Sequence, residues 1–140
     1  MSDKDNLNTF VADINKLINY KFKNEKLLTE SFTHKSISSV NYERLEFLGD
    51  AVLQLIITKY LYKTYPSIDE GSLSREKQSI VSRKTIAKVS LQLGLINFLI
   101  SKNLDFNSSA SLKSTISANL IESLIGALFL DSDYSMCEEI

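Results

Sequence analysis

The chain has 140 residues, of which 44% are hydrophobic and 24% are charged, so it can bury one ordinary core and we expect a single domain. One proline and four glycines among many good helix formers predict an all-α fold. Sixteen Lys and Arg against seventeen Asp and Glu give a net charge of −1, which excludes a global basic field for nucleic-acid binding. Local patches or metal ions must therefore hold any polyanionic partner.

The single cysteine, Cys137, has no Cys or His partner at ligand spacing, which excludes a disulfide framework and argues against a zinc site. The first residues lack the basic and apolar regions of a signal peptide, and no apolar run reaches the length of a membrane span. We therefore expect a cytoplasmic protein with no membrane partner and no small-molecule cofactor.

Helical periodicity predicts three helices in the first half of the chain, over residues 7–19, 25–34 and 42–64, and we expect residues 1–6 to be flexible. Pro66 ends the third helix, because proline cannot continue a helix.

A polar turn at residues 67–72 leads to two more predicted helices, over 73–82 and 83–93, with Gly94 as a C-terminal cap. Residues 101–115 are rich in Ser and Asn and are expected to form a surface loop.

A strongly apolar helix is predicted over residues 116–130. The last residues begin like a further helix with Ser132 or Asp133 as its cap, and this helix is expected to be truncated at Ile140.

Three carboxylates, Glu43, Glu46 and Asp50, interrupt the third predicted helix. On a helix that advances about 100° per residue they fall within an arc of roughly 60°, so they share one face, and apolar neighbours make this face semi-buried. The helix macrodipole after an Asn41 cap accounts for Glu43 and in part for Glu46, but not for Asp50. Gly49 costs about 1 kcal/mol relative to alanine inside a helix and therefore indicates close approach of another backbone or a ligand.

Glu122 is the only ionisable residue of the helix predicted over 116–130, and Asn119 lies on the same face. A buried carboxylate needs a cation, and this helix contains no Lys or Arg, so the partner is a basic side chain of another helix or a bound metal. Carboxylates brought together from two helices repel each other, and clustered hard oxygen ligands suit Mg²⁺ or Mn²⁺. A divalent-metal site and a structural ion-pair network both remain open.

The segment "ERLEFLGDAVL" closely resembles the signature of the ribonuclease III catalytic domain. The segments "FTHKS", "DEGSLSREKQSIV" and "ISANLIESLIGALFLD" are similar to further parts of this family, in the expected order over residues 17–131. The resemblance implies that residues 1–140 form an all-α endonuclease domain and a homodimer. It also implies cleavage of double-stranded RNA with Mg²⁺, or Mn²⁺ in its place, to 5′-phosphate and 3′-hydroxyl ends in RNA processing.

Four residues match metal-coordinating positions of that family: Glu46, Asp50, Asn119 and Glu122. Asp50 and Glu122 match the positions most directly tied to catalysis. Asn119 departs from the family, which usually has Asp there. Since the amide removes a negative charge but retains an oxygen, we expect lower metal affinity and turnover with unchanged geometry. Carboxylate-held metal ions supply the nucleophilic water and the charge neutralisation that phosphodiester hydrolysis requires.

Other matched positions concern the substrate and the dimer. Glu43 and Glu70 match further acidic positions of the cleft, with roles in substrate placement or dimer contacts. Phe47 matches an aromatic residue that plugs a socket in the partner subunit. For His34 and Lys35, an RNA contact and a cation at a helix C-terminus both remain open.

The leading interpretation is a magnesium-dependent endoribonuclease specific for double-stranded RNA. The alternative is a catalytically impaired ribonuclease-III-like domain that acts as an RNA-binding or assembly scaffold, which Asn119 and the lack of a double-stranded-RNA-binding domain in this sequence allow. With its net charge of −1, the domain alone is expected to bind RNA weakly and with strong salt dependence.

Overall fold

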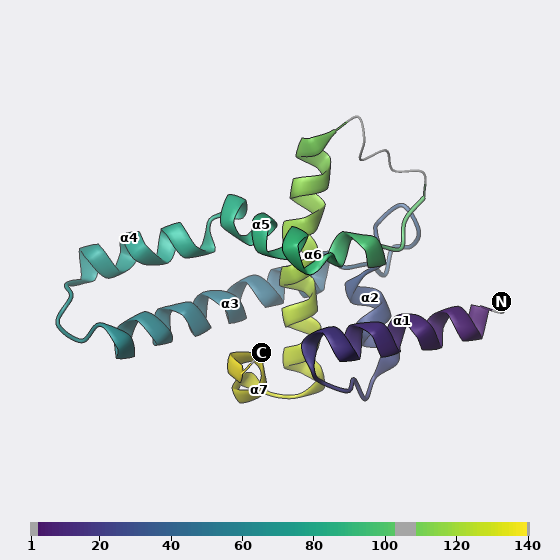
Figure 1. The fold of residues 1–140 in the computed structure, drawn as a ribbon, viewed down its shortest axis with the longest axis horizontal. Coiled ribbons are helices and arrows are strands. Elements are labelled where there is room, and N and C mark those ends of the chain that lie inside the picture. The colour runs from purple at the N-terminus through teal and green to yellow at the C-terminus, as the bar shows by residue number, and fades with distance from the viewer. Residues whose placement is uncertain (1–2, 103–108, 140) are drawn as a thin grey trace.

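Helix α6 (Ala110–Asp131) runs through the middle of the molecule, and four helices pack against it: α2 (Glu25–Ser31), α3 (Glu43–Thr64), α5 (Arg83–Leu93) and α7 (Tyr134–Glu139) (Figure 1). The computed structural model describes residues 3–102 and 109–139. These residues form an all-α fold with the following elements: α1 (Asp3–Ile18), α2 (Glu25–Ser31), α3 (Glu43–Thr64), α4 (Glu70–Val81), α5 (Arg83–Leu93), the 3-10 helix η1 (Leu95–Phe98), α6 and α7 (Tyr134–Glu139).

The core lies where α1, α2, α3 and η1 meet α6. Six of its residues have no exposed surface: Ile14, Leu28, Phe32, Leu95, Leu120 and Ala127. The rings of Phe10, Phe32 and Phe98 meet edge to face, which adds to the stabilisation from apolar burial. This core holds α3 and α6 in a fixed relation.

The crossing of α3 and α6 depends on two glycines. Gly49 of α3 lies against the backbone of Glu122, and a Cβ atom on Gly126 of α6 would lie 2.2 Å from the carbonyl oxygen of Leu45. Larger residues would push the helices apart. The prediction that Gly49 marks close approach of another backbone is therefore confirmed.

Helices α3 and α4 form an antiparallel hairpin that extends to one side of the molecule (Figure 1). Helix α3 ends at Thr64, directly before the predicted stop. Helix α4 begins at Glu70, three residues earlier than the sequence predicts, because the Asp69 side chain accepts a hydrogen bond from the Ser72 N–H at 2.8 Å and caps the helix.

Helix α2 ends at Ser31, three residues before the predicted end. The chain leaves the helix to form a short parallel bridge, in which the His34 N–H donates to the Ile100 carbonyl and the Ile100 N–H donates to Phe32, both at 2.9 Å. This partner is distant in the sequence, so local periodicity could not reveal the early end.

The predicted loop over 101–115 is wrong at its C-terminal end, because α6 begins at Ala110 and Ser109 caps it by accepting the Leu112 N–H at 3.1 Å. The remaining residues 103–108 of this predicted loop lie outside the described residues. Helix α1 begins at Asp3, so it includes part of the segment expected to be flexible.

Two predicted caps are confirmed. Gly94 ends α5 in the left-handed conformation, with φ of 74°. The Asp133 side chain caps α7 by accepting the Met136 N–H at 2.9 Å.

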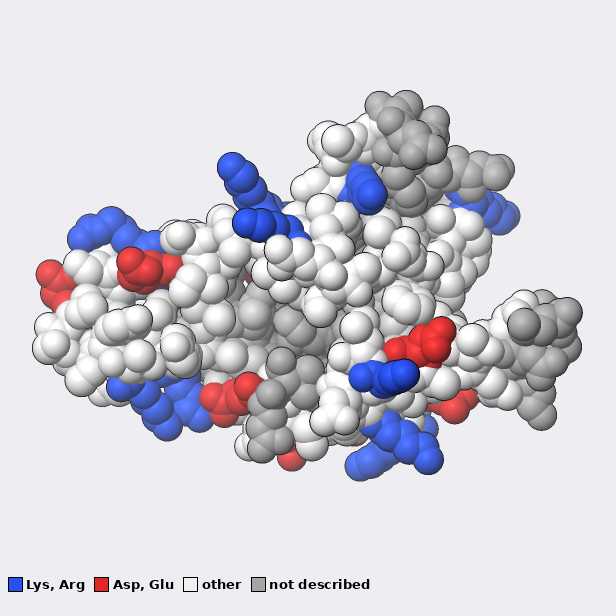
Figure 2. All heavy atoms as spheres, viewed as in Figure 1, with Lys and Arg blue, Asp and Glu red and all other residues white. Residues whose placement is uncertain are grey.

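In the described ranges, none of the helices combines the length and the hydropathy that a membrane span needs. Figure 2 shows that, on the face drawn, Lys and Arg side chains are spread over several parts of the surface and interspersed with Asp and Glu. This distribution agrees with the net charge of −1 and with the expectation that no global basic field exists.

Candidate active site

A cleft of about 440 Å³ lies between the first half of α3, the start of α5 and the middle of α6. Its lining contains all three carboxylates of α3 that the sequence placed on one face, together with Glu122. Glu46 and Asp50 are half-buried, as predicted, but Glu43 is exposed. The expected Asn41 cap is wrong, because Tyr42 occupies the N-cap position of α3 without a side-chain cap hydrogen bond. Asn41 lies one residue further out, and its side-chain oxygen accepts the Glu43 N–H at 2.9 Å.

Glu122 is the most deeply buried acid of the cleft, with only 4% of its side chain exposed. Burial, followed by the neighbouring Asp50 carboxylate and a hydrogen bond with it, raises the pKa of Glu122 to about 7 against the opposing effect of Arg83. The crossing of α3 and α6 therefore brings Asp50 and Glu122 together in one cleft.

Within the described part of the chain, the cation that contacts Glu122 is Arg83 of α5. Its Nη1 atom lies 2.8 Å from Glu122 Oε1 and 3.9 Å from Glu46 Oε1. Its Nη2 atom donates a hydrogen bond to Asn119 Oδ1. Of the two partners that the sequence left open, the structure supplies the basic side chain of another helix.

Arg83 was missed in the sequence because its partners lie on other helices. One signal was available: Arg83 is the first residue of α5, directly after the cap residue Ser82. A cation is unfavourable at a helix N-terminus, which indicates that this residue serves contacts outside its own helix.

A polar chain continues from Asn119 away from the cleft. Asn119 Nδ2 donates a long hydrogen bond of 3.5 Å to the hydroxyl of the buried Tyr42. The Tyr42 ring meets the His34 ring edge to face at 6.0 Å. Burial raises the pKa of Tyr42, so this hydroxyl stays neutral and can also donate.

His34 is buried, and its Nδ1 atom accepts the Ser36 N–H at 3.1 Å. Burial, and then the charge of Lys35, lowers the pKa of His34. The position of His34 does not support its interpretation as a cation at a helix C-terminus, because α2 ends at Ser31 and the Nδ1 atom accepts a backbone N–H, and the contact of His34 with RNA stays a prediction. Lys35 is exposed, and its contact with RNA stays a prediction.

The structure does not bring Glu70 into this cleft. Glu70 lies at the far end of the α3–α4 hairpin, beside a separate hollow with Leu61, Tyr62 and Lys77. Its role in substrate placement or dimer contacts stays a prediction, and within one chain it cannot act together with Glu122.

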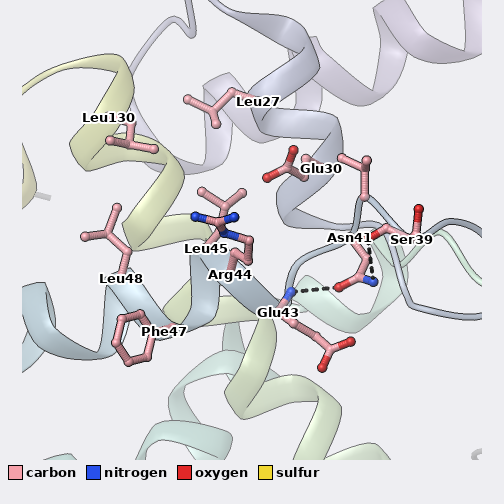
Figure 3. Close-up of a pocket in the computed structure, with 11 residues that line it drawn as sticks. Leu27, Glu30, Ser39, Asn41, Glu43, Arg44, Leu45, Phe47, Leu48 and Leu130 are labelled. Atoms are coloured by element: carbon pink, nitrogen blue, oxygen red, sulfur yellow. Dashed lines mark hydrogen bonds between the residues drawn. The ribbon is translucent and has the colours of Figure 1, made fainter.

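Phe47 is 84% exposed. It borders both the acidic cleft and a second hollow of about 1000 Å³. Figure 3 shows the Phe47 ring on the outer side of α3, across this hollow from Leu27 of α2 and Leu130 of α6. The exposed aromatic ring thus borders a hollow whose lining combines apolar side chains with the charged residues Glu30, Glu43 and Arg44.

The chemistry of the oxygen donors fits a hard divalent cation. Glu46, Asp50 and Glu122 offer carboxylates, and Asn119 offers an amide oxygen. In residues 3–102 and 109–139, however, no three or more His, Cys, Asp and Glu side chains are arranged to hold a metal ion. The donor types therefore suit a metal, whereas their arrangement is that of a site neutralised by Arg83.

Fold and site together define an all-α domain with an acidic cleft between two crossing helices. The model of the ribonuclease III domain family matches residues 43–133, which include every carboxylate of the cleft. The chain belongs to this family.

Solved structures support this assignment. The nuclease domain of ribonuclease III from Campylobacter jejuni superposes with a TM-score of 0.83 at 35% identity, over 89% of this chain and 88% of that chain. That structure is described as flexible in a region involved in dimer formation.

Curated relatives agree. Ribonuclease 3 of Campylobacter fetus is 43% identical over 88% of this chain and 56% of its own length. Ribonuclease 3 of Idiomarina loihiensis is 37% identical over 93% of this chain and 57% of its own length. The chain therefore spans little more than half the length of the curated relatives it matches.

Proposed function

We propose that this chain is the catalytic domain of a metal-dependent endoribonuclease that hydrolyses double-stranded RNA to 5′-phosphate and 3′-hydroxyl ends during RNA processing in the cytoplasm. The observation that carries the proposal is that Asp50 of α3 and the buried Glu122 of α6 line the same cleft. Two neighbouring carboxylates repel each other unless a proton or cation lies between them, so a purely structural role for both is unfavourable.

Glu46, Asp50, Asn119 and Glu122 would hold the metal, Mg²⁺ or Mn²⁺ in its place. A divalent cation held there supplies Lewis-acid stabilisation of phosphate charge and lowers the pKa of a bound water. The protein's own contribution is positioning: the rigid α3–α6 crossing fixes Asp50 opposite Glu122, and burial of Glu122 keeps bulk water away from one side of the site.

Glu43 lies at the exposed rim of the cleft, where it can contribute to substrate placement. Double-stranded RNA is recognised mainly by its A-form shape, its 2′-hydroxyls and its phosphates, which suits an open cleft without base-sized pockets. The mixed surface charge supports weak and salt-dependent binding by this domain alone.

We further propose that the domain acts as a homodimer through the surface around Phe47. An isologous interface needs one patch that is complementary to itself. The exposed Phe47 ring lies beside a hollow whose apolar part is formed by Leu27, Leu48 and Leu130, so a two-fold axis can place each ring in the hollow of the other subunit. The hollow lies beside the acidic cleft, and therefore dimerisation would place two cleavage sites on one duplex.

The test is cleavage of a long duplex RNA with Mg²⁺ or Mn²⁺, followed by analysis of product length and of the 5′ ends. The chain should give short duplex products with 5′-phosphates. Asp50→Asn and Glu122→Gln should each lower the rate at least about 100-fold, whereas the matched change Glu138→Gln at the surface pair with Lys59 should leave the rate unchanged. Equal rates in all four proteins would refute the proposed site.

Arg83 favours one alternative function. Since Arg83 neutralises Glu122 and contacts Asn119, the domain could be a catalytically impaired scaffold for RNA binding or assembly. Such a scaffold would retain duplex RNA without cutting it in either metal ion.

A further inference from the structure

We propose that Arg83 and the divalent metal are alternative counter-ions of the same carboxylates, so that Arg83 neutralises the site while it is metal-free and moves outward when the metal binds. This inference rests on the proposed function, because it requires a metal to bind at this cleft. The inference goes beyond that function because it assigns control of the metal affinity to Arg83 of α5.

The guanidinium of Arg83 uses the same oxygen atoms that a metal would need. It contacts Glu122 at 2.8 Å and Glu46 at 3.9 Å, and it donates to the side-chain oxygen of Asn119. These are three of the four proposed ligands. Mg²⁺ requires close, nearly octahedral oxygen coordination, which a guanidinium hydrogen-bonded to the same oxygens obstructs. Both cations therefore cannot occupy the cleft in this arrangement.

The two partners of this ion pair differ in their freedom to move. The Arg83 side chain is 52% exposed, whereas the Glu122 side chain is 4% exposed. Arg83 is long and borders solvent, so its charged group can be hydrated outside the cleft while its backbone stays in place. Glu122 is fixed on α6 beneath the α3 crossing. Exchange of the counter-ion therefore proceeds through a rotation of Arg83.

The position of Arg83 in its own helix supports this role. Arg83 and Lys84 occupy the first turn of α5, which contains no acidic residue. The positive end of the macrodipole lies there, so a cation destabilises the helix end slightly. The contacts of Arg83 across the cleft must offset this destabilisation. Arg83 therefore contributes to the acidic cleft and not to the stability of α5.

The experiment measures metal binding rather than cleavage. Calorimetric titration with Mn²⁺ is compared among the unchanged chain, Arg83→Gln, Arg83→Lys and the control Arg75→Gln. Arg75 is exposed on α4 and contacts Ser72 of its own helix, so its change alters the net charge equally but away from the cleft. Arg83→Gln should bind Mn²⁺ at least about fivefold more tightly, Arg83→Lys should lie between, and Arg75→Gln should match the unchanged chain.

Thermal unfolding in a chelator gives a second readout. Arg83→Gln should unfold at a lower temperature than the unchanged chain without metal, and Mn²⁺ should raise its unfolding temperature by more. If Arg83→Gln does not fold without metal, the Mn²⁺ affinity of Arg83→Lys decides: it should exceed that of the unchanged chain.

Equal or weaker Mn²⁺ binding after loss of Arg83 would overturn the inference. Such a result would leave the proposed function in place if the unchanged chain binds Mn²⁺ and Asp50→Asn abolishes that binding. Only the role of Arg83 would then be removed. If the unchanged chain itself binds no Mn²⁺, the metal site fails and this inference fails with it.

Discussion

A Cβ atom on Gly49 would lie 1.6 Å from the carbonyl oxygen of Glu122, so only glycine lets α3 and α6 cross at this point. Asp50 follows Gly49 directly, and the side chain of Glu122 extends from the residue that Gly49 touches. The contact that fixes the fold is therefore also the contact that assembles the acidic cleft. Changes to one cannot be separated from changes to the other.

Gly49→Ala should lower the free energy of unfolding by at least about 2 kcal/mol, since the two helices must separate to admit the methyl group. Gly71→Ala is the matched control, because a Cβ atom there would lie 3.6 Å from its nearest neighbour, the flexible end of Arg75. That control should leave stability unchanged or raise it by up to about 1 kcal/mol. Urea unfolding measures both, and equal effects would show that the crossing is not tight.

The sequence revealed those residues of the site that are unfavourable within their own helix. A glycine inside an apolar helix and a lone carboxylate in another are both unfavourable by themselves, so Gly49 and Glu122 could be recognised without a structure. The one-face arrangement of Glu43, Glu46 and Asp50 also followed from helical geometry alone.

Features that depend on distant partners could not be predicted in this way. The counter-ion Arg83 was missed, since its position opposite Glu122 depends on the turn at Ser82 between α4 and α5. The early end of α2 depends on a bridge between Thr33 and Ile100.

Asn119→Asp should shift the Mg²⁺ dependence of cleavage to concentrations about fivefold lower. The change adds a negative charge, which attracts a doubly charged metal more strongly than the singly charged Arg83, so the balance between them moves toward the metal. Tyr42 can compensate for the lost amide donor by donating its own hydroxyl hydrogen. The measurement is a Mg²⁺ titration of the cleavage rate for both proteins, and superimposable curves would mean that position 119 does not limit metal binding.

Phe47→Ala should weaken dimerisation at least about 30-fold, since exposed aromatic anchors that fill a pocket cost about 2 kcal/mol or more when truncated. Tyr62→Ala is the control, because Tyr62 is 72% exposed on the same helix but lies near the end of the α3–α4 hairpin. Sedimentation equilibrium over a range of concentrations gives the dissociation constants. Loss of dimer in both variants, or in neither, would place the interface elsewhere.

Asp131 joins the C-terminal end of α6 to the segment between α1 and α2. Its carboxylate accepts the backbone N–H groups of Lys23 and Asn24 and the hydroxyl of Tyr20, each at 2.8 Å. Burial by itself raises the pKa of Asp131, but these three hydrogen bonds outweigh it and hold the pKa below the ordinary value of 3.8. The stability from this carboxylate is therefore present above the ordinary pKa and is lost as the pH falls through the lowered one.

Asp131→Asn should lower the free energy of unfolding by about 1 to 2 kcal/mol near neutral pH. The amide is neutral and has a single acceptor oxygen, so it cannot replace the carboxylate in all three hydrogen bonds. As the pH falls from the ordinary pKa of 3.8 through the lowered pKa, the difference from the unchanged chain should shrink, because the unfolded chain takes up a proton at Asp131 first and the folded chain is protonated there only below the lowered pKa. Asp13→Asn, at an exposed position of α1, should give a small difference at every pH. Urea unfolding at a series of pH values measures all three proteins. A difference between Asp131→Asn and the unchanged chain that stays constant down to the lowest pH would show that the three hydrogen bonds do not depend on the charge of Asp131.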